Sequence, residues 1–376
     1  MSTGLRSART ARGWSQERLV REIERYARQH VTDVASTASL RVYVSEWENG
    51  KRKISDHYAA ILRQLLGVTD AELRGAPAVV ALPAADGYDD LLSRIDSASS
   101  VSASMVKAFN DQTELLRTMD RQLGAANLVD QMTGHLSALE EALNFAVLPS
   151  VRRPLALALA GASTLAAWQA IDVGAVERAW RHYELAKRAA RDAEEPMYLA
   201  HAMGEQAYVL CEAGRPALGV ELIRDAQRVL GQGGSPRLWA WLHAAEAELC
   251  AHAEMADDAR RALDAAMDEI PPGPEDRDPD MLSIFVNGSH LARWRGNVLS
   301  ILGDDDAVTS LYGALEVADP TFVRARAGLH TDLAHAHLTR AEYDEAKNHL
   351  RQARLLASRT GSVRQRRRID LLSARL

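Results

Sequence analysis

Apolar residues recur every three or four positions through the first 75 residues, which is the spacing of helices that bury one face. The pattern predicts four short helices and a last helical turn. Their expected caps are Ser15, Ser39 and Ser55 at the N-termini and Gly13, Asn49-Gly50 and Gly67 at the C-termini. The second helix should run to about Arg28, and a loop across residues 31–38 should precede the third. Thr69 with Glu72 has the spacing of a capping box for the last turn.

A breaker-rich segment, residues 75–87, indicates a joint between two domains. A short helix around Leu91, Leu92 and Ile95 should follow it, and then two long helices over about 105–123 and 126–148. The expected division of the chain is a head of residues 1–75, a linker of 76–104 with its short helix, a helical cap of 105–153 and a repeat array of 154–376.

Beyond Pro154 the chain repeats one pattern: a small residue, a bulky residue four positions later, and an alanine three positions after that. The copies are Ala179/Tyr183/Ala186, Gly219/Ile223/Ala226, Ala259/Leu263/Ala266, Ala307/Leu311/Ala314 and Ala346/Leu350/Ala353. Most copies follow a turn, at Gly174, Gly214, Gly303 or Ala341, and small residues stand on the preceding helices at Ala167, Ala207, Ala247 and Ala334. Small residues let antiparallel helices approach closely, so the pattern predicts a stack of helical hairpins.

The composition supports an all-α fold with a real core. Hydrophobic residues make up 47% of the chain and charged residues 26%, while aromatic residues make up only 5%. The charge is uneven: residues 1–76 hold 13 Lys/Arg and 9 Asp/Glu, whereas the rest holds 32 and 42. A basic head on an acidic body indicates that only the head meets a polyanion.

Residues 154–171 carry no charge, but most of their apolar residues are alanines and polar side chains interrupt them. We therefore expect a packed repeat helix and no membrane partner. The first turn has no apolar leader, and Cys211 and Cys250 form no metal-ligand or redox spacing. These features imply a cytoplasmic location, and association with the nucleoid if the polyanion that the head meets is DNA.

Two strings in the head resemble the XRE (Cro/repressor-type) helix-turn-helix family. They are Ala11-Arg12-Gly13-Trp14-Ser15-Gln16-Glu17 and Ser45-Glu46-Trp47-Glu48-Asn49-Gly50-Lys51-Arg52-Lys53. The resemblance covers about 70 residues and implies that the third predicted helix enters the major groove of DNA. By position in the family, Arg41, Val42, Ser45 and Glu46 would face the bases, and Gln16, Asn49, Lys51, Arg52 and Lys53 would contact phosphates.

Two features depart from the family. A carboxylate at Glu46 repels phosphates, and 24 positions separate Ser15 from Ser39, roughly a dozen more than in compact members. The longer form still resembles regulators of actinobacteria. The alternative is a head that docks on protein and does not read DNA.

The array resembles tetratricopeptide repeats, although its copies stand 39 to 48 residues apart; the loop 271–276 explains the longest interval. In such a superhelix, one face of the first helix of each hairpin would line the concave side. This face contains the residue that directly follows the small residue, together with its neighbours three and seven positions earlier. This choice nominates Thr164, Trp168, His201, Tyr208, Trp241, Glu248 and His335 as effector-binding or partner-binding residues, with inter-repeat core as the alternative. The run Arg364–Arg368 is typical of a solvated face, with a phosphate contact as its alternative.

No nucleotide loop, metal-ligand set or nucleophile with an adjacent base is visible, so we expect no enzyme activity, no metal and no cofactor. The leading hypothesis is a homodimeric transcriptional regulator that binds palindromic DNA. Its array would bind a peptide or small-molecule effector or mediate oligomerisation. The helix-turn-helix/tetratricopeptide regulators that this arrangement resembles imply a role in the control of development or secondary metabolism. The alternative is an adaptor whose array binds a protein partner.

Overall fold

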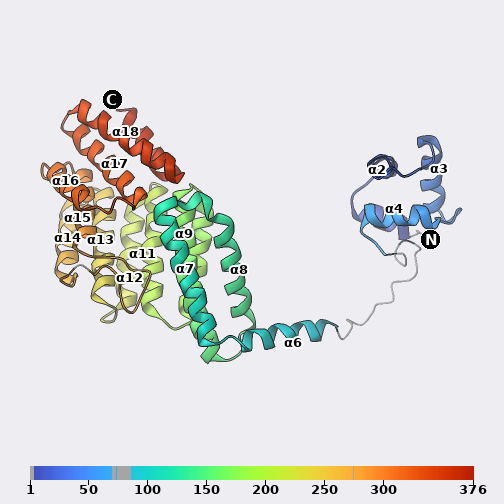
Figure 1. Cartoon of the computed structure of the whole chain (residues 1–376), viewed down its shortest axis with the longest axis horizontal. Helices are drawn as coiled ribbons and strands as arrows, with labels where there is room; N and C mark the ends of the chain where they lie inside the picture. Colours follow the sequence, from blue (N-terminus) through green and yellow to red (C-terminus); the bar gives the residue numbers. More distant parts are fainter. Residues whose placement is uncertain (1–3, 70–72, 74–85, 274) are drawn as a thin grey trace. The chain divides into compact units, whose positions relative to one another are not determined.

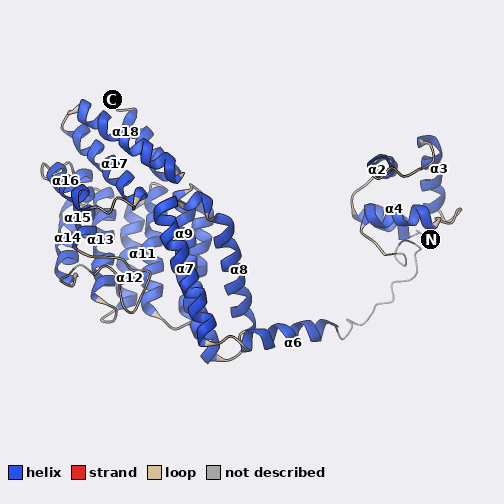
Figure 2. Ribbon diagram, in the orientation of Figure 1, coloured by secondary structure: helices blue, strands red, loops and turns tan. Residues whose placement is uncertain are grey.

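The computed structural model describes residues 4–69, 73, 86–273 and 275–376. The chain falls into two compact units, residues 1–91 and 92–376. Regular structure among the described residues is helical (Figure 2), apart from an isolated bridge between Arg277 and Phe285. The expected all-α class is therefore confirmed.

The first unit contains four described helices before residue 69. They are α1 (Gly4–Ala11), α2 (Gln16–Gln29), α3 (Thr37–Glu48) and α4 (Asp56–Leu66). Leucine, isoleucine, valine and tryptophan side chains from all four helices share one core. The expected elongated second helix is confirmed, and its N-cap Ser15 accepts a hydrogen bond from the Arg18 amide. Glu72 of the expected capping box lies outside the described residues.

The predicted cap of the third helix was wrong by one turn. Ser36 is the N-cap of α3, and its hydroxyl accepts a hydrogen bond from the amide of Ser39. Ser39 lies inside the first turn of the helix, with its own hydroxyl 3.0 Å from that of Ser36. Serine is a favoured N-cap residue, so residue type does not distinguish the two positions. In the helix that begins after Ser36, Leu40 and Val44 lie in the core.

A buried ion pair joins three helices of this unit. The guanidinium of Arg9 on α1 donates to both carboxylate oxygens of Glu48 on α3, at 2.5 and 3.0 Å. Gln16 on α2 donates to the same carboxylate at 2.8 Å. Burial alone would raise the pKa of Glu48, but these hydrogen bonds lower it below the ordinary value. The network fixes the end of α3 against α1 and the start of α2.

The helix α6 (Asp86–Ser99) spans the division between the units. The second unit then opens with α7 (Ala103–Leu123), a short turn of 3-10 helix (Ala125–Asn127) and α8 (Val129–Phe145). Five hairpins follow: α9 (Pro149–Asp172) with α10 (Val176–Asp192), α11 (Pro196–Glu212) with α12 (Pro216–Leu230), α13 (Pro236–His252) with α14 (Ala256–Glu269), α15 (Gly288–Leu302) with α16 (Ala307–Val317), and α17 (Val323–Thr339) with α18 (Tyr343–Thr360). The last helix is α19 (Val363–Ser373) (Figure 1).

The predicted repeat pattern is confirmed in every hairpin. Each copy lies on the second helix of its pair, and the bulky members Tyr183, Ile223 and Leu311 are completely buried. The turns at Gly174, Gly214, Gly303 and Ala341 all have positive φ, and so does Glu254, the turn of the third hairpin, which the pattern did not single out. The small residues let the two helices of a hairpin approach closely. At Gly219, for example, a Cβ would lie only 3.0 Å from the Ala207 carbonyl oxygen of the partner helix.

The first helix of the array, α9, begins at Pro149 rather than beyond Pro154, which lies inside it. It is the one described helix long and apolar enough to cross a membrane. However, 78% of its most apolar 18-residue window is buried among neighbouring helices. This burial is that of a core helix.

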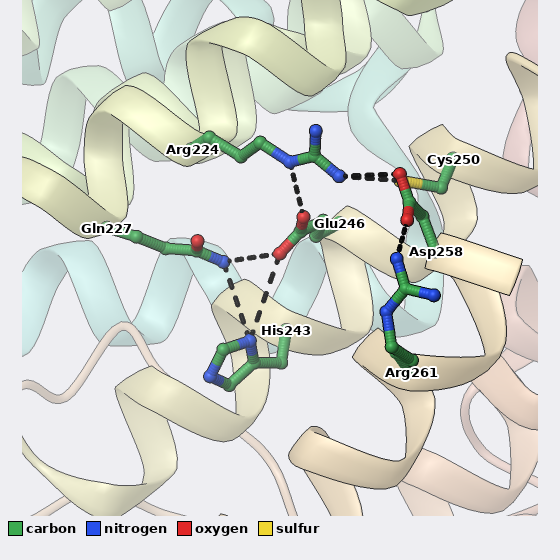
Figure 3. Close-up of polar contacts among 7 residues, drawn as sticks. All are labelled: Arg224, Gln227, His243, Glu246, Cys250, Asp258 and Arg261. Atoms are coloured by element: carbon green, nitrogen blue, oxygen red, sulfur yellow. Dashed lines mark hydrogen bonds and ion pairs between the residues drawn. The ribbon is translucent and has the colours of Figure 1, made fainter. Parts of the chain in front are cut away.

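Polar side-chain contacts also join the second hairpin to the third (Figure 3). Arg224 on α12 donates to Glu246 on α13 at 2.7 Å and to Asp258 on α14 at 3.0 Å. Gln227 donates to the second oxygen of Glu246 at 2.8 Å. Burial alone would raise the pKa of Glu246, but hydrogen bonds from His243, Arg224 and Gln227 lower it to about 2.

This network predicts a loss of stability in acid. Because the folded pKa of Glu246 lies below the ordinary value of 4.5, its contribution is complete above about pH 5 and is lost as the pH falls toward 2. The free energy of unfolding of the wild type relative to Glu246→Gln should therefore decrease by about 3 kcal/mol over this window. Urea denaturation at stepped pH measures the difference. Glu221→Gln, on the exposed side of α12, controls for the loss of one negative charge, and a difference that does not change with pH would contradict the assignment.

Candidate functional site

The array of the second unit closes on itself. Helix α7 packs against α17 and α18, and α19 packs against α9, so helices from the two ends of the unit are in contact. Ser362, the N-cap of α19, donates to the Asp172 carboxylate at the end of α9 at 2.6 Å. Arg364 on α19 donates to Glu212 on α11 at 2.5 Å. These contacts bring helices from both ends of the unit together over the concave side of the array.

A cavity of about 290 Å³ lies on this concave side. The first helices of all five hairpins line it, together with α7, α19 and the segment around Phe285. Three tryptophans contribute to its wall: Trp168, Trp241 and Trp294. The volume lies at the lower end of the range of small-molecule sites, and the mixture of aromatic walls with a few polar groups is typical of them.

Four of the seven residues nominated for the concave face line the cavity: Trp168, Tyr208, Trp241 and Glu248. The rings of Trp168 and Tyr208 meet edge to face with centroids 6.0 Å apart. The Tyr208 hydroxyl donates to Glu248 at 2.9 Å, and the indole nitrogen of Trp294 donates to the same oxygen at 2.9 Å. Burial and the Glu248 charge raise the pKa of Tyr208 well above its ordinary value, so the phenol stays protonated.

The other three nominated residues lie outside the lining. Thr164 is buried and donates to the Ala160 carbonyl of its own helix; Leu165, three positions before Trp168, lines the cavity instead. His201 is buried beneath Trp241, with ring centroids 4.9 Å apart. His335 lies with its Nδ1 3.0 Å from the Ser300 hydroxyl, and Asp332, one turn earlier, faces the cavity.

The sequence interpretation missed the contribution of α15. The loop before this helix shifts the repeat interval, and no small residue was assigned on it. Gly296 holds that place, because a Cβ there would lie 2.6 Å from Leu311. The same rule then gives Asn297, Trp294 and His290, and all three line the cavity.

Six arginines line the cavity, and four of them have acidic partners. Arg324 on α17 pairs with Asp120 on α7 and lies 3.6 Å from Asp172 on α9. Burial alone would lower the pKa of Arg324, but Asp120 and Asp172 raise it. The other partnered arginines are Arg117 with Glu114, Arg364 with Glu212 and Arg368 with Asp332. The run Arg364–Arg368 is therefore not simply a solvated face, because its first and last members turn inward.

The remaining two arginines, Arg121 and Arg293, have no carboxylate partner among the described residues. The guanidinium of Arg121 lies 3.6 Å from the ring centroid of Phe285 and 5.5 Å from that of Phe322. Burial and the neighbouring Arg117 lower the pKa of Arg121 to about 10. Burial likewise lowers the pKa of Arg293. Both groups remain cations near neutral pH.

Several polar atoms of the lining have no hydrogen-bond partner among the described residues. They include Oδ1 of Asp120, Oδ1 of Asn297, Oγ of Ser283 and Nδ1 of His290. Asp120 and Asn297 are only 1% and 8% exposed, so burial without a partner is costly for both. Such groups concentrate where a ligand completes the hydrogen bonding.

In the first unit, α3 exposes the residues that the sequence assigned to base contact. Val42 is 53% exposed, and Arg41 is exposed while making a bidentate pair with Glu17 at 3.1 Å. Ser45 and Glu46 are partly exposed, and Glu46 lies 3.5 Å from Arg52.

The residues assigned to phosphate contact are exposed but differ in their partners. Lys51, Arg52 and Lys53 follow α3 on the surface. The Arg52 guanidinium lies 3.7 Å from the ring centroid of Tyr43. Asn49 donates to the Ser45 carbonyl at 2.8 Å, and Gln16 is engaged by Glu48. Three of the five side chains therefore already have polar partners within the unit: Gln16 and Asn49 through hydrogen bonds and Arg52 through its ion pair with Glu46.

Among the described residues, no group of three or more His, Cys, Asp or Glu is arranged to hold a metal ion. Burial raises the pKa of Cys211 to about 12 and that of Cys250 to about 11. Both cysteines therefore stay as thiols near neutral pH, as small buried or half-buried side chains.

No family model and no curated protein matches the chain. Two solved structures follow a similar helical course. One is a Rap protein complexed with competence and sporulation factor, with 12% identity and a TM-score of 0.46 over 92% of this chain and 96% of that chain. The other is aspartyl phosphate phosphatase F from Bacillus subtilis, with 10% identity and a TM-score of 0.43 over 90% and 89%. These similarities are too distant to transfer a ligand or a partner to this chain.

The closing contact between the ends of the unit predicts a large difference between two glycines. Gly124 has φ +84° and ψ 162°, a conformation almost restricted to glycine, and a Cβ there would collide with the backbone of Thr360. Gly214 has φ +74° with open space around it. Gly124→Ala should lower the free energy of unfolding by about 2 kcal/mol more than Gly214→Ala, which costs only the left-handed conformation. Equal losses in chemical denaturation would contradict the closure.

Proposed function

We propose that this chain is a regulatory protein whose second unit binds a small-molecule or peptide effector in its central cavity. The observation that carries the proposal is the lining of this cavity. It combines aromatic walls with buried polar atoms that lack protein partners, such as Asn297 Oδ1. A packing core of a helical repeat has no need of such groups, and retaining them costs stability. A binding role without catalysis accounts for this arrangement.

We further propose that the first unit binds double-stranded DNA through α3, as a homodimer on a palindromic site. Support comes from the exposed row Arg41, Val42, Ser45 and Glu46 on a rigid helix, followed by Lys51, Arg52 and Lys53. A helix of this kind fits the major groove, and the basic residues after it suit phosphates. Effector binding in the second unit would then change dimerisation or DNA access.

The DNA-binding proposal predicts different defects for two classes of residue. On a site enriched from a random DNA library by the full chain, Arg41→Ala should weaken binding by about 10- to 100-fold, because a base contact is lost. Lys53→Ala should weaken binding to all sequences and lower the salt slope by about one. Gel shifts over a salt series measure both effects, and Arg181→Ala on the exposed side of α10 is the control.

Failure would be plain in this experiment. If no sequence is enriched at low salt, or if Arg41→Ala binds the enriched site as tightly as the wild type, the first unit does not read DNA through α3.

A second candidate is a protein-interaction adaptor whose head docks on another protein. The observation that favours it is the charge balance on α3: Arg41 pairs with Glu17, and Glu46 pairs with Arg52. The outer face therefore presents exposed Val42 among paired charges, which suits a protein surface as well as a phosphate backbone.

The adaptor reading predicts that the tagged chain recovers one protein in stoichiometric amount, independently of DNA. Val42→Asp should abolish this recovery, because it places an unpaired charge at the centre of the docked face. Val31→Asp is the matched control, since Val31 is 96% exposed in the loop before α3. A partner retained by Val42→Asp would show that α3 is not the docking face.

A further inference from the structure

We propose that the cavity of the second unit binds a small organic anion, whose carboxylate or phosphate is held by Arg121 and Arg293. The inference rests on the proposed effector-binding role and specifies the chemistry of the effector.

The charge pattern of the lining is selective. Arg324, Arg364 and Arg368 each have an acidic partner at ion-pair distance, and these pairs join helices. Arg121 and Arg293 have none among the described residues, although both line the same cavity. A buried cation without a partner lowers stability, so a side chain kept in that state is suited to receive an anion from outside.

Both cations line the cavity together with one histidine, His290. His290 is one turn before Arg293 on α15, and both Arg293 and Arg121 contribute to holding its pKa at about 4, after burial. Its imidazole is therefore neutral near pH 7, with Nδ1 free of any partner in the described residues. Three potential donor groups from α7 and α15 therefore line the same cavity.

Glu248 does not neutralise this region. It is the strongest opposite charge acting on Arg293, yet no ion pair forms between them. Its Oε2 instead accepts from the Tyr208 hydroxyl and the Trp294 indole, both at 2.9 Å. The carboxylate is held by neutral donors, which leaves Arg293 available.

The other polar atoms of the lining that lack a hydrogen-bond partner indicate which groups the rest of the ligand should carry. Oδ1 of Asp120 and Oδ1 of Asn297 are buried acceptors without a donor. They call for N–H or O–H groups on the ligand. Phe285 and Phe322, which lie beside Arg121 in the lining, provide contact for a planar or apolar portion. The class is therefore an organic anion with hydrogen-bond donors and a flat or aromatic part.

Four commercial probes test the proposal on the full chain without DNA. Hippurate and its amide differ only in the carboxylate, and phenyl phosphate and phenol differ only in the phosphate. Tryptophan fluorescence, reported by Trp168, Trp241 and Trp294, follows a titration to about 10 mM, and a thermal melt gives an independent reading. At least one anion should bind with saturation, at least about tenfold more tightly than its neutral analogue. The two pairs distinguish a carboxylate from a phosphate ligand.

Arg121→Gln and Arg293→Gln should each weaken binding of that anion by about tenfold or more, because a charge-assisted hydrogen bond is lost. Arg366→Gln, on the exposed side of α19, should bind like the wild type. Without a probe, Arg293→Gln should melt at or above the wild-type temperature, since a half-buried cation without an ion-pair partner is removed. A purely structural arginine would lower that temperature.

Three outcomes would overturn the proposal: neutral analogues that bind as tightly as the anions, glutamine variants that bind the anions normally, or no saturable binding of any probe. The first of these leaves effector binding in the cavity standing and removes only the anion. Loss of DNA binding by the head is a separate result, because none of these titrations contains DNA.

Discussion

Arg324 is the side chain on which the shape of the second unit depends. From α17 it pairs with Asp120 of the cap helix α7 and approaches Asp172 at the end of α9, so one guanidinium joins both ends of the hairpin stack. A stack of hairpins has no intrinsic reason to close, because each hairpin buries its face on its neighbours alone. Closure removes three charged groups from water, and only ion pairs of good geometry offset the free-energy cost of that desolvation. Removal of one member leaves an uncompensated charge at a cost of about 3–5 kcal/mol. The cavity exists because this contact brings α7 against the concave side, while Ser362 and Arg364 hold α19 there.

The charges of the cavity divide into those that build it and those that remain available. Arg364 and Arg368 are satisfied by Glu212 and Asp332, and each pair ties α19 to another helix. Arg121 and Arg293 lie in the same wall without such partners. If all six arginines served closure alone, a tightly packed core would supply a carboxylate for each, or an apolar side chain in its place. The uneven distribution of acidic partners therefore divides the arginines of one lining into those that hold the scaffold together and those of the proposed binding surface. The unpaired arginines lower the stability of the free protein at the place where a bound ligand would restore it.

The repeats were predictable because their signal is local. The small–bulky–alanine pattern sets how near two consecutive helices lie, and every copy is buried as the pattern requires. The third-helix cap was missed because Ser36 and Ser39 are both suitable and only the core placement of Leu40 decides between them. The same rule identifies Asn297, Trp294 and His290 once Gly296 is assigned as the small residue of its helix. No such rule could identify the pair of Arg324 with Asp120, because 204 positions separate the two residues and no periodicity connects an end cap to a late hairpin.

In the first unit, two glutamates two positions apart on α3 have opposite consequences. Glu48 is 2% exposed and holds Arg9 and Gln16, so it fixes the helix and is not available to any partner. Glu46 is at the surface and its contact with Arg52 is 3.5 Å, between side chains that are 37% and 46% exposed. Exposed pairs of this kind contribute about 0–1 kcal/mol, as does the pair of Arg41 with Glu17. A phosphate or a guanine edge offers either arginine a stronger partner at little cost. The surface pairs would therefore oppose the proposed DNA binding only weakly, and the buried glutamate would supply the rigidity that α3 would need in a groove.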